Sequence, residues 1–177
     1  MNDKKQKVLF DELAIKEAVE RLGKEISKDY DEPIVVISLL RGSFMFTADL
    51  VRAIDIPVVV DFMTTSSYED RESSNGVVEI IHDVRFDIEG QNVLIVDDIC
   101  DSGFTMKNIV DYLATKNPKS IKTCVMLDKP SRRNVAIEPD FVGETIEDVF
   151  IVGYGLNYGD YYSNIPYIFT FEGWDIW

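Results

Sequence analysis

The chain has 177 residues, of which 46% are hydrophobic and 28% charged, a composition typical of a soluble globular protein with one sizeable core. Its formal net charge of −14 argues against DNA, RNA or an anionic membrane as a partner. With one histidine and two cysteines in the sequence, a Ser-His-Asp triad, a Cys-His pair and a multi-histidine zinc site are all disfavoured.

The first part of the chain alternates helical and strand patterns. The first seven residues lack the apolar segment of a secretory signal, and no run reaches membrane-spanning length, so we expect a cytoplasmic protein. Asp11 is a favoured N-cap, and apolar residues then recur on one helical face to about Lys28, which predicts the first helix. Further elements are predicted as a strand over 33–40, a helix over 44–52 and a buried strand over 57–63.

A polar segment follows over residues 64–76. It is unusually long for a connection inside a compact domain, which predicts a mobile loop over the site, although a hairpin tip fits the composition equally well. A strand is expected over 77–84, with His82 on its exposed face and without a role. Cys100 and Cys124 occur in apolar strand contexts and are interpreted as small buried side chains.

The most specific pattern of the chain lies in residues 93–105. The run 93–96 is typical of a strand buried on both faces, and it is followed by Asp97 and Asp98. Adjacent strand residues point to opposite faces, so these two carboxylates cannot contact one ligand in the same way. Residues 101–105, Asp-Ser-Gly-Phe-Thr, offer hydroxyls, a glycine able to adopt positive φ and the free N–H groups of a helix start, which together predict a phosphate site.

Carboxylates beside a phosphate site indicate a ligand with both hydroxyls and phosphates and a hard cation between them, such as a ribose phosphate. The bare pattern would also fit an ordinary polar turn between a strand and a helix. A helix is expected after the pattern, then a strand over 120–127 that ends at Asp128-Lys129-Pro130.

Alternating strands and helices, followed by an aromatic tail of short strand-like pieces, predict one α/β domain over residues 1–177. We expect a twisted, mainly parallel sheet flanked by helices, with a small strand-rich hood over about 141–177 to which the N-terminus contributes. Ligands of such sheets bind at the carboxyl ends of the strands, where Arg41, residues 97–105 and Lys129 fall.

The pattern in residues 93–105 resembles the motif with which type I phosphoribosyltransferases bind phosphoribosyl pyrophosphate (PRPP). The similarity extends over nearly the whole chain to the bacterial hypoxanthine-guanine phosphoribosyltransferases. The further stretches that carry it are Leu40-Arg41-Gly42-Ser43, Ser67-Tyr68, 127–133, 139–143 and 150–156. The resemblance implies transfer of the 5-phosphoribosyl group from PRPP to hypoxanthine, guanine or xanthine in purine salvage, giving the nucleoside monophosphate, such as IMP or GMP, and pyrophosphate. It also implies Mg²⁺ as cofactor and a homodimer or homotetramer.

The resemblance further implies roles for individual residues. Those that would bind PRPP are Asp97, Asp98, Asp101, Ser102, Gly103, Phe104 and Thr105. Asp97 and Asp98 would contact the ribose hydroxyls, directly or through Mg²⁺. Asp101 matches the general base near N7 of the purine, where a proton must leave as the glycosidic bond forms.

Purine recognition would fall to Lys129, Phe150 and Ile151. The Lys129 ammonium would donate to a 6-oxo group and meet the 6-amino group of adenine donor to donor. Phe150 would stack on the base, and the backbone of Ile151 would contact its edge. Pyrophosphate would contact the backbone of Leu40, Arg41 and Gly42. In the family a peptide bond of this turn is often cis, and the sequence leaves open whether the Leu40–Arg41 bond is cis here. The loop tip Ser67-Tyr68 would close over the site.

Two positions depart from the family pattern. Asn157 stands where relatives usually carry an Asp that helps hold a second Mg²⁺, and an amide is a weaker ligand for a hard cation. Ser163 stands where they carry an Arg that clamps pyrophosphate. Three hypotheses stay open: a 6-oxopurine transferase, which the complete PRPP motif favours; a transferase with another acceptor base; and a non-catalytic regulator that senses PRPP or nucleotides, which the acidic charge disfavours.

Overall fold

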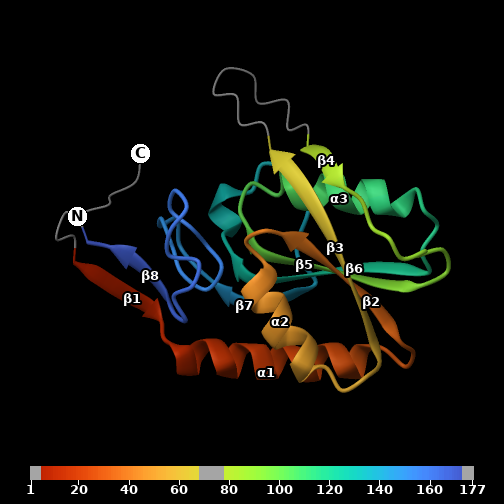
Figure 1. Ribbon diagram of the computed structural model, residues 1–177, viewed down its shortest axis with the longest axis horizontal. Helices are drawn as coiled ribbons and strands as arrows, with labels where there is room; N and C mark the ends of the chain where they lie inside the picture. Colours follow the sequence, from red (N-terminus) through yellow and green to blue (C-terminus); the bar gives the residue numbers. More distant parts are fainter. Residues whose placement is uncertain (1–4, 68–77, 173–177) are drawn as a thin grey trace.

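The computed structural model describes residues 5–67 and 78–172, with a large mixed sheet and a small one (Figure 1). The elements are β1 (Gln6–Phe10), α1 (Glu12–Asp29), β2 (Ile34–Leu40), α2 (Phe44–Ala53), β3 (Val58–Ser67), β4 (Val78–His82), β5 (Asn92–Cys100), α3 (Phe104–Ala114), β6 (Ser120–Asp128), the 3₁₀ turn η1 (Pro130–Arg132), β7 (Phe141–Thr145) and β8 (Ile168–Phe171).

The large sheet has the strand order β4-β3-β2-β5-β6-β7, with β4 antiparallel and all other neighbours parallel. Successive residues of β2 point to opposite faces: Ile34 and Val36 belong to the core with α1 and α2, whereas Val35 and Ile37 belong to the core with α3. The helices therefore cover both faces of the sheet, which confirms the predicted α/β class. It also places the carboxyl ends of the parallel strands at one edge.

Helix α1 begins where the sequence indicates. The Asp11 side chain caps it by accepting a hydrogen bond of 2.8 Å from the Ala14 N–H. The apolar face packs against α2, and a Cβ at Gly23 would lie 2.2 Å from the Ala53 carbonyl oxygen. Glycine is therefore needed there for the close approach of the two helices.

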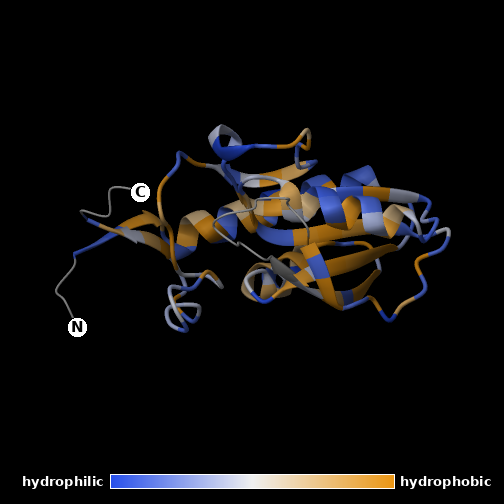
Figure 2. Ribbon diagram, turned by 90° about the horizontal axis from the view of Figure 1, so that it is seen from above, coloured by the Kyte–Doolittle hydropathy of each residue, from blue (hydrophilic) through white to orange (hydrophobic). Residues whose placement is uncertain are grey.

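The small sheet pairs the first strand of the chain with its last. β1 and β8 are antiparallel, and Figures 1 and 2 show them at one end of the molecule, beyond the large sheet. The predicted start of the hood was placed too early, because β7 belongs to the large sheet. The Asp140 carboxylate accepts a 2.8 Å hydrogen bond from the Thr123 N–H of β6, which fixes the start of β7 beside that strand.

Two further boundaries differ from the predictions. β5 does not end at Asp98 but continues to Cys100, so two more strand residues follow the paired carboxylates. β3 continues to Ser67, so residues 64–67 of the predicted loop are strand, paired with β4. The rest of that loop, Tyr68 included, lies outside the described residues, as does the Ser67 side chain.

Smaller predictions are confirmed. Cys100 and Cys124 are buried free thiols, and His82 is exposed at the end of β4. In the described part of the chain, no helix is long and apolar enough to cross a membrane.

Candidate active site

The turn after β2 is held by buried hydroxyl groups. Ser43 Oγ donates to the Leu39 carbonyl at 2.5 Å, and Ser38 Oγ lies 2.8 Å from the hydroxyl oxygens of both Ser43 and Thr47. The Leu40–Arg41 peptide, which the sequence left open, is cis. The network fixes the backbone of residues 40–42 at the edge where ligands of parallel sheets bind.

Two glycines let backbone segments meet at this turn. A Cβ at Gly42 would lie 1.9 Å from Oδ2 of Asp98, so only glycine leaves room for that carboxylate. A Cβ at Gly155, where φ is +98°, would lie 2.1 Å from the Gly42 carbonyl oxygen. The Gly155 N–H donates to the Ser163 carbonyl at 3.0 Å. The segment that carries Ser163 is thus packed against the predicted pyrophosphate turn.

The two carboxylates at the end of β5 are half-buried and interact with each other. Asp97 accepts a 2.9 Å hydrogen bond from the Asp98 N–H, and Asp98 accepts one of 2.7 Å from the Ile99 N–H. Burial raises the pKa of Asp97, and the neighbouring charge of Asp98 raises it further. Burial is also the largest cause of the raised pKa of Asp98. Such a pair favours cations and hydroxyl donors as ligands.

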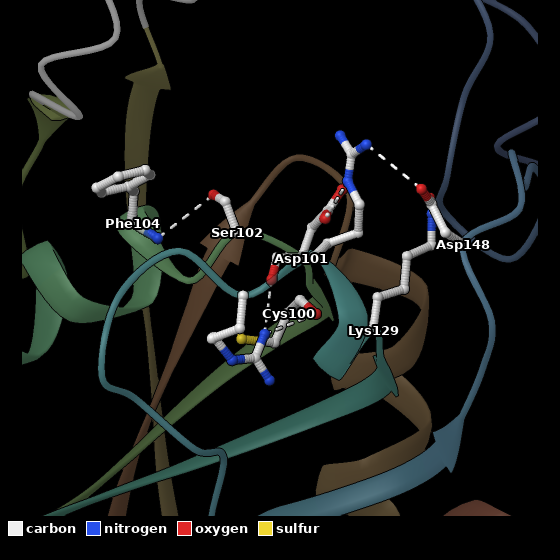
Figure 3. A network of polar contacts seen from close by, with 8 residues as sticks. Cys100, Asp101, Ser102, Phe104, Lys129 and Asp148 are labelled. Carbon is white, nitrogen blue, oxygen red and sulfur yellow. Dashed lines mark hydrogen bonds and ion pairs between the residues drawn. The ribbon is translucent and has the colours of Figure 1, made fainter. Parts of the chain in front are cut away.

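The loop between β5 and α3 has the geometry of a phosphate site. Gly103 is the N-cap of α3 with φ +86°, and Figure 3 shows the Phe104 N–H directed at Ser102, whose Oγ lies 3.5 Å away. The first N–H groups of a helix have no partners within it and favour an anion. The buried side chain of Arg133 supports the loop by donating hydrogen bonds to the carbonyls of Asp101, at 2.6 Å, and Cys100, at 3.2 Å.

Lys129 and Asp101 are carried by neighbouring strand ends. Cys100 and Asp128 are partners in the register of β5 and β6, and the Lys129 N–H donates to the Cys100 carbonyl at 2.9 Å. The Lys129 residue is only 7% exposed, and burial lowers the pKa of its ammonium against the opposing charges of Asp101 and Asp148. The predicted purine reader and the predicted general base are therefore brought together.

The other predicted purine residues lie on the segment after β7. Phe150 is half-buried, and its ring meets that of Tyr158 edge to face with centroids 5.7 Å apart. Ile151 is buried in the core beside α1. Asn157 is exposed, and its side-chain amide donates to the Gly159 carbonyl within the same turn.

Sequence reasoning missed three charged residues of the site. Arg133 is the support of the phosphate loop, and Arg132 and Asp148 form ion pairs beside Asp101 and Lys129. The signal was present: residues 128–133 carry four charges directly after a buried strand, at the ligand-binding edge of the sheet.

Comparison with known proteins agrees with this geometry. The model of the phosphoribosyl transferase domain family matches residues 5–159. The hypoxanthine-guanine phosphoribosyltransferase of Aquifex aeolicus is 52% identical over 171 residues, which are 96% of each chain. The chain belongs to the hypoxanthine-guanine phosphoribosyltransferase family. Another member, the hypoxanthine phosphoribosyltransferase of Salmonella typhimurium, is 46% identical over 91% of this chain and 92% of its own.

Solved structures of hypoxanthine phosphoribosyltransferases have the same fold. The enzyme of Staphylococcus aureus superposes with a TM-score of 0.92 at 42% identity, covering 97% of this chain and 93% of its own. The enzyme of Bacillus anthracis gives a TM-score of 0.91 at 41% identity, covering 95% and 99%. The resemblance found in the sequence is thereby confirmed, as is the type I phosphoribosyltransferase fold.

Proposed function

We propose that this chain transfers the 5-phosphoribosyl group of PRPP to a 6-oxopurine, giving the nucleoside monophosphate and pyrophosphate. The observation that carries the proposal is one juxtaposition: a phosphate-type helix start, the Asp101 carboxylate and the buried Lys129 ammonium lie on two adjacent strand ends. The function named for the relatives at 45–52% identity supports the same reaction.

The ribose phosphate would occupy the loop between β5 and α3. The N–H groups of residues 102–105 and the hydroxyls of Ser102 and Thr105 would hold the 5′-phosphate, because a helix start attracts an anion. The sugar and pyrophosphate would lie between this loop and the turn at residues 40–42, with Asp97 and Asp98 on the ribose hydroxyls.

Asp101 would act as the general base. As the bond between the anomeric carbon and the purine nitrogen forms, pyrophosphate leaves and the imidazole ring of the base must lose a proton. A carboxylate at the mouth of the phosphate loop can accept this proton, and general base catalysis of this kind is worth roughly 10²–10⁴ in rate.

Lys129 would select the base by its oxo group. A buried ammonium facing a 6-amino group is left without an acceptor, and a site built around a hydrogen bond rejects such an analogue strongly. Phe150 would stack on the purine, and the Ile151 backbone would contact its edge. Preference among hypoxanthine, guanine and xanthine depends on that edge.

The pyrophosphate end would be held chiefly by the backbone of residues 40–42, with Ser67 and Tyr68 as further contacts. Asn157 and Ser163 offer neither the carboxylate nor the cation that relatives carry, so we expect weaker binding of PRPP. In the described part of the chain, the Asn157 amide is used within its own turn and Ser163 contributes its backbone carbonyl to Gly155.

The residues at the end of β5 fit a magnesium ion. They offer two neighbouring carboxylates with hard oxygen ligands. This suits Mg²⁺, which is usually bound by one or two carboxylates together with substrate phosphates and water. Asp97 and Asp98 would hold it, and when bound it would neutralise charge on the pyrophosphate.

The protein is also proposed to be a homo-oligomer. An apolar face on β3, β4 and the following turn exposes Val60 (40%), Phe62 (46%), Ile81 (53%) and Phe86 (39%), and exposed apolar patches of this kind mark interfaces. A second copy of the chain would cover it. Light scattering should give a smaller mass for Phe62→Asp than for the wild type; an unchanged mass would place the interface elsewhere.

The reaction is tested by mixing the protein with Mg²⁺, PRPP and hypoxanthine and following IMP by absorbance and pyrophosphate by a coupled assay. Equal amounts of both products are expected. Guanine and xanthine run in parallel separate a changed acceptor base from the main proposal. PRPP binding without product from any of the three bases would instead favour a regulator.

A further inference from the structure

Four charged side chains form an open series at the purine end of the site. Arg132 Nε lies 3.2 Å from Asp101 Oδ1, and Nη1 of the same guanidinium lies 3.4 Å from Asp148 Oδ2. Lys129 Nζ lies 3.9 Å from the other Asp148 oxygen. The order is therefore Lys129, Asp148, Arg132, Asp101, with alternating sign. Its two ends are the side chains proposed to contact the purine.

These two ends stand on neighbouring strand ends. Asp101 directly follows Cys100 of β5 and Lys129 directly follows Asp128 of β6, and these two residues are partners in the register of the strands (Figure 3). The charge of Asp101 also raises the pKa of Lys129, against the larger effect of burial. An ammonium and a carboxylate so placed gain by pairing directly, more strongly because Lys129 is buried. Such a pair would occupy the acceptor and the donor that the purine requires.

We infer that Arg132 is a positioning residue that keeps Asp101 and Lys129 from pairing with each other. Its guanidinium engages Asp101 on one side and orients Asp148 on the other, so that each end of the series has its own partner. The planar fork of an arginine can contact two carboxylates at once, whereas a lysine offers a single nitrogen. The inference rests on the proposed function, because it concerns how the empty site stays open for the base.

Stabilisation of the fold gives little reason for an arginine at position 132. Its side chain is 51% exposed and that of Asp101 is 41% exposed, and ion pairs at such exposed positions contribute little to stability. The adjacent Arg133 is the opposite case, with a side chain 8% exposed that donates to backbone carbonyls of the loop. The two neighbouring arginines thus act on different parts of the site.

The test compares Arg132→Ala, Arg132→Lys and a control, Lys119→Ala, in steady-state kinetics. Lys119 is equally exposed and pairs with Glu32 at the opposite end of the strands. For Arg132→Ala we expect the KM for hypoxanthine to rise about tenfold while the KM for PRPP stays within about twofold, since only the purine must break the new pair. Arg132→Lys should recover part of the loss, and Lys119→Ala should behave as the wild type.

A second perturbation reaches the same contact from the other side. Asp148→Asn removes the partner of Lys129 and should also raise the KM for hypoxanthine. The double variant with Arg132→Ala should be hardly worse than the poorer single variant, because both changes release the same pair. Additive effects would contradict the inference. If Arg132→Ala fails to fold, Asp148→Asn alone tests the inference, and an unchanged KM for hypoxanthine in that variant would contradict it.

The effects on kcat and on KM separate the inference from a simpler role. If Lys129 replaces Arg132 beside Asp101, the KM for hypoxanthine rises while kcat changes little. A fall in kcat with an unchanged KM for hypoxanthine would mean that Arg132 acts only on the proton transfer to Asp101. Unchanged kinetics would make it an ordinary surface pair. Either result overturns the inference, whereas failure of the proposed function would appear as absence of IMP from the wild type.

Discussion

Gly103 is the position at which backbone conformation and packing limit the phosphate loop most clearly. Its φ of +86° lies in the left-handed region, where an alanine costs about 1–2 kcal/mol. A Cβ there would also lie 2.8 Å from Ile137 Cγ2 and 2.9 Å from Arg133 Cδ. The Arg133 guanidinium is fixed by its contacts with the loop carbonyls, so the neighbours cannot yield freely, and overpacking adds about 1–3 kcal/mol.

Gly103→Ala should therefore destabilise the protein by about 2–5 kcal/mol, and at this chain length each kcal/mol lowers Tm by about 2–4 °C. The matched control is Gly90→Ala, where φ is +69° but nothing lies within 4 Å of the new Cβ. Unfolded-state effects of the two substitutions cancel in the comparison. Calorimetry without ligand should show Gly103→Ala losing about 1–3 kcal/mol more than the control. Equal melting temperatures would refute the packing argument.

Other substitutions test the ligand assignments. Lys129→Ala should reduce kcat/KM for hypoxanthine by roughly 30- to 150-fold, the effect of losing a charged hydrogen-bond donor, with PRPP binding nearly kept; unchanged kcat/KM would remove Lys129 from the purine site. Restoring the family residues by Asn157→Asp with Ser163→Arg should lower the KM for PRPP and sharpen its Mg²⁺ dependence, because a carboxylate and a cation are added at the pyrophosphate end. If PRPP affinity stays the same or falls in titration calorimetry, this chain holds pyrophosphate in another way.

Much of the fold could be predicted because local signals are strong in this chain. Examples are the Asp11 cap, the helical spacing that follows it and the apolar runs of β2 and β5. From such signals, most of the predicted ends of helices and strands lie within one or two residues of the observed ends. The continuation of β5 beyond Asp98 to Cys100 was missed because a pair of acidic residues, which are rare in strands, was taken as the strand end. Here the pairing with β6 on one side overrides that preference. β7 was assigned to the hood because its place depends on a long-range contact, that of Asp140 with Thr123.

The site was predicted in part for the same reason. Asp101, Ser102, Gly103 and Lys129 stand in contiguous patterns that carry their chemistry with them. Arg132 stands in the charged run 128–133, but its pairing with Asp148 cannot be predicted from that run, since this contact exists only after β6 and the segment behind β7 are folded side by side. Gly155 could not be predicted to be part of the site either, because the sequence around it does not indicate that its backbone must approach the Gly42 carbonyl.

The central claim, that Asp101 accepts the proton of the purine, is tested most directly by the chemical step of Asp101→Asn. The carboxamide keeps the shape of the side chain but removes the proton acceptor. Single-turnover rapid quench with PRPP, Mg²⁺ and hypoxanthine avoids masking by slow product release. We expect the rate of IMP formation to fall by roughly 10²–10⁴ with PRPP affinity nearly unchanged. If Asp101 only stabilises the turn before α3, asparagine serves about as well, and a rate within a few-fold of wild type would contradict the account.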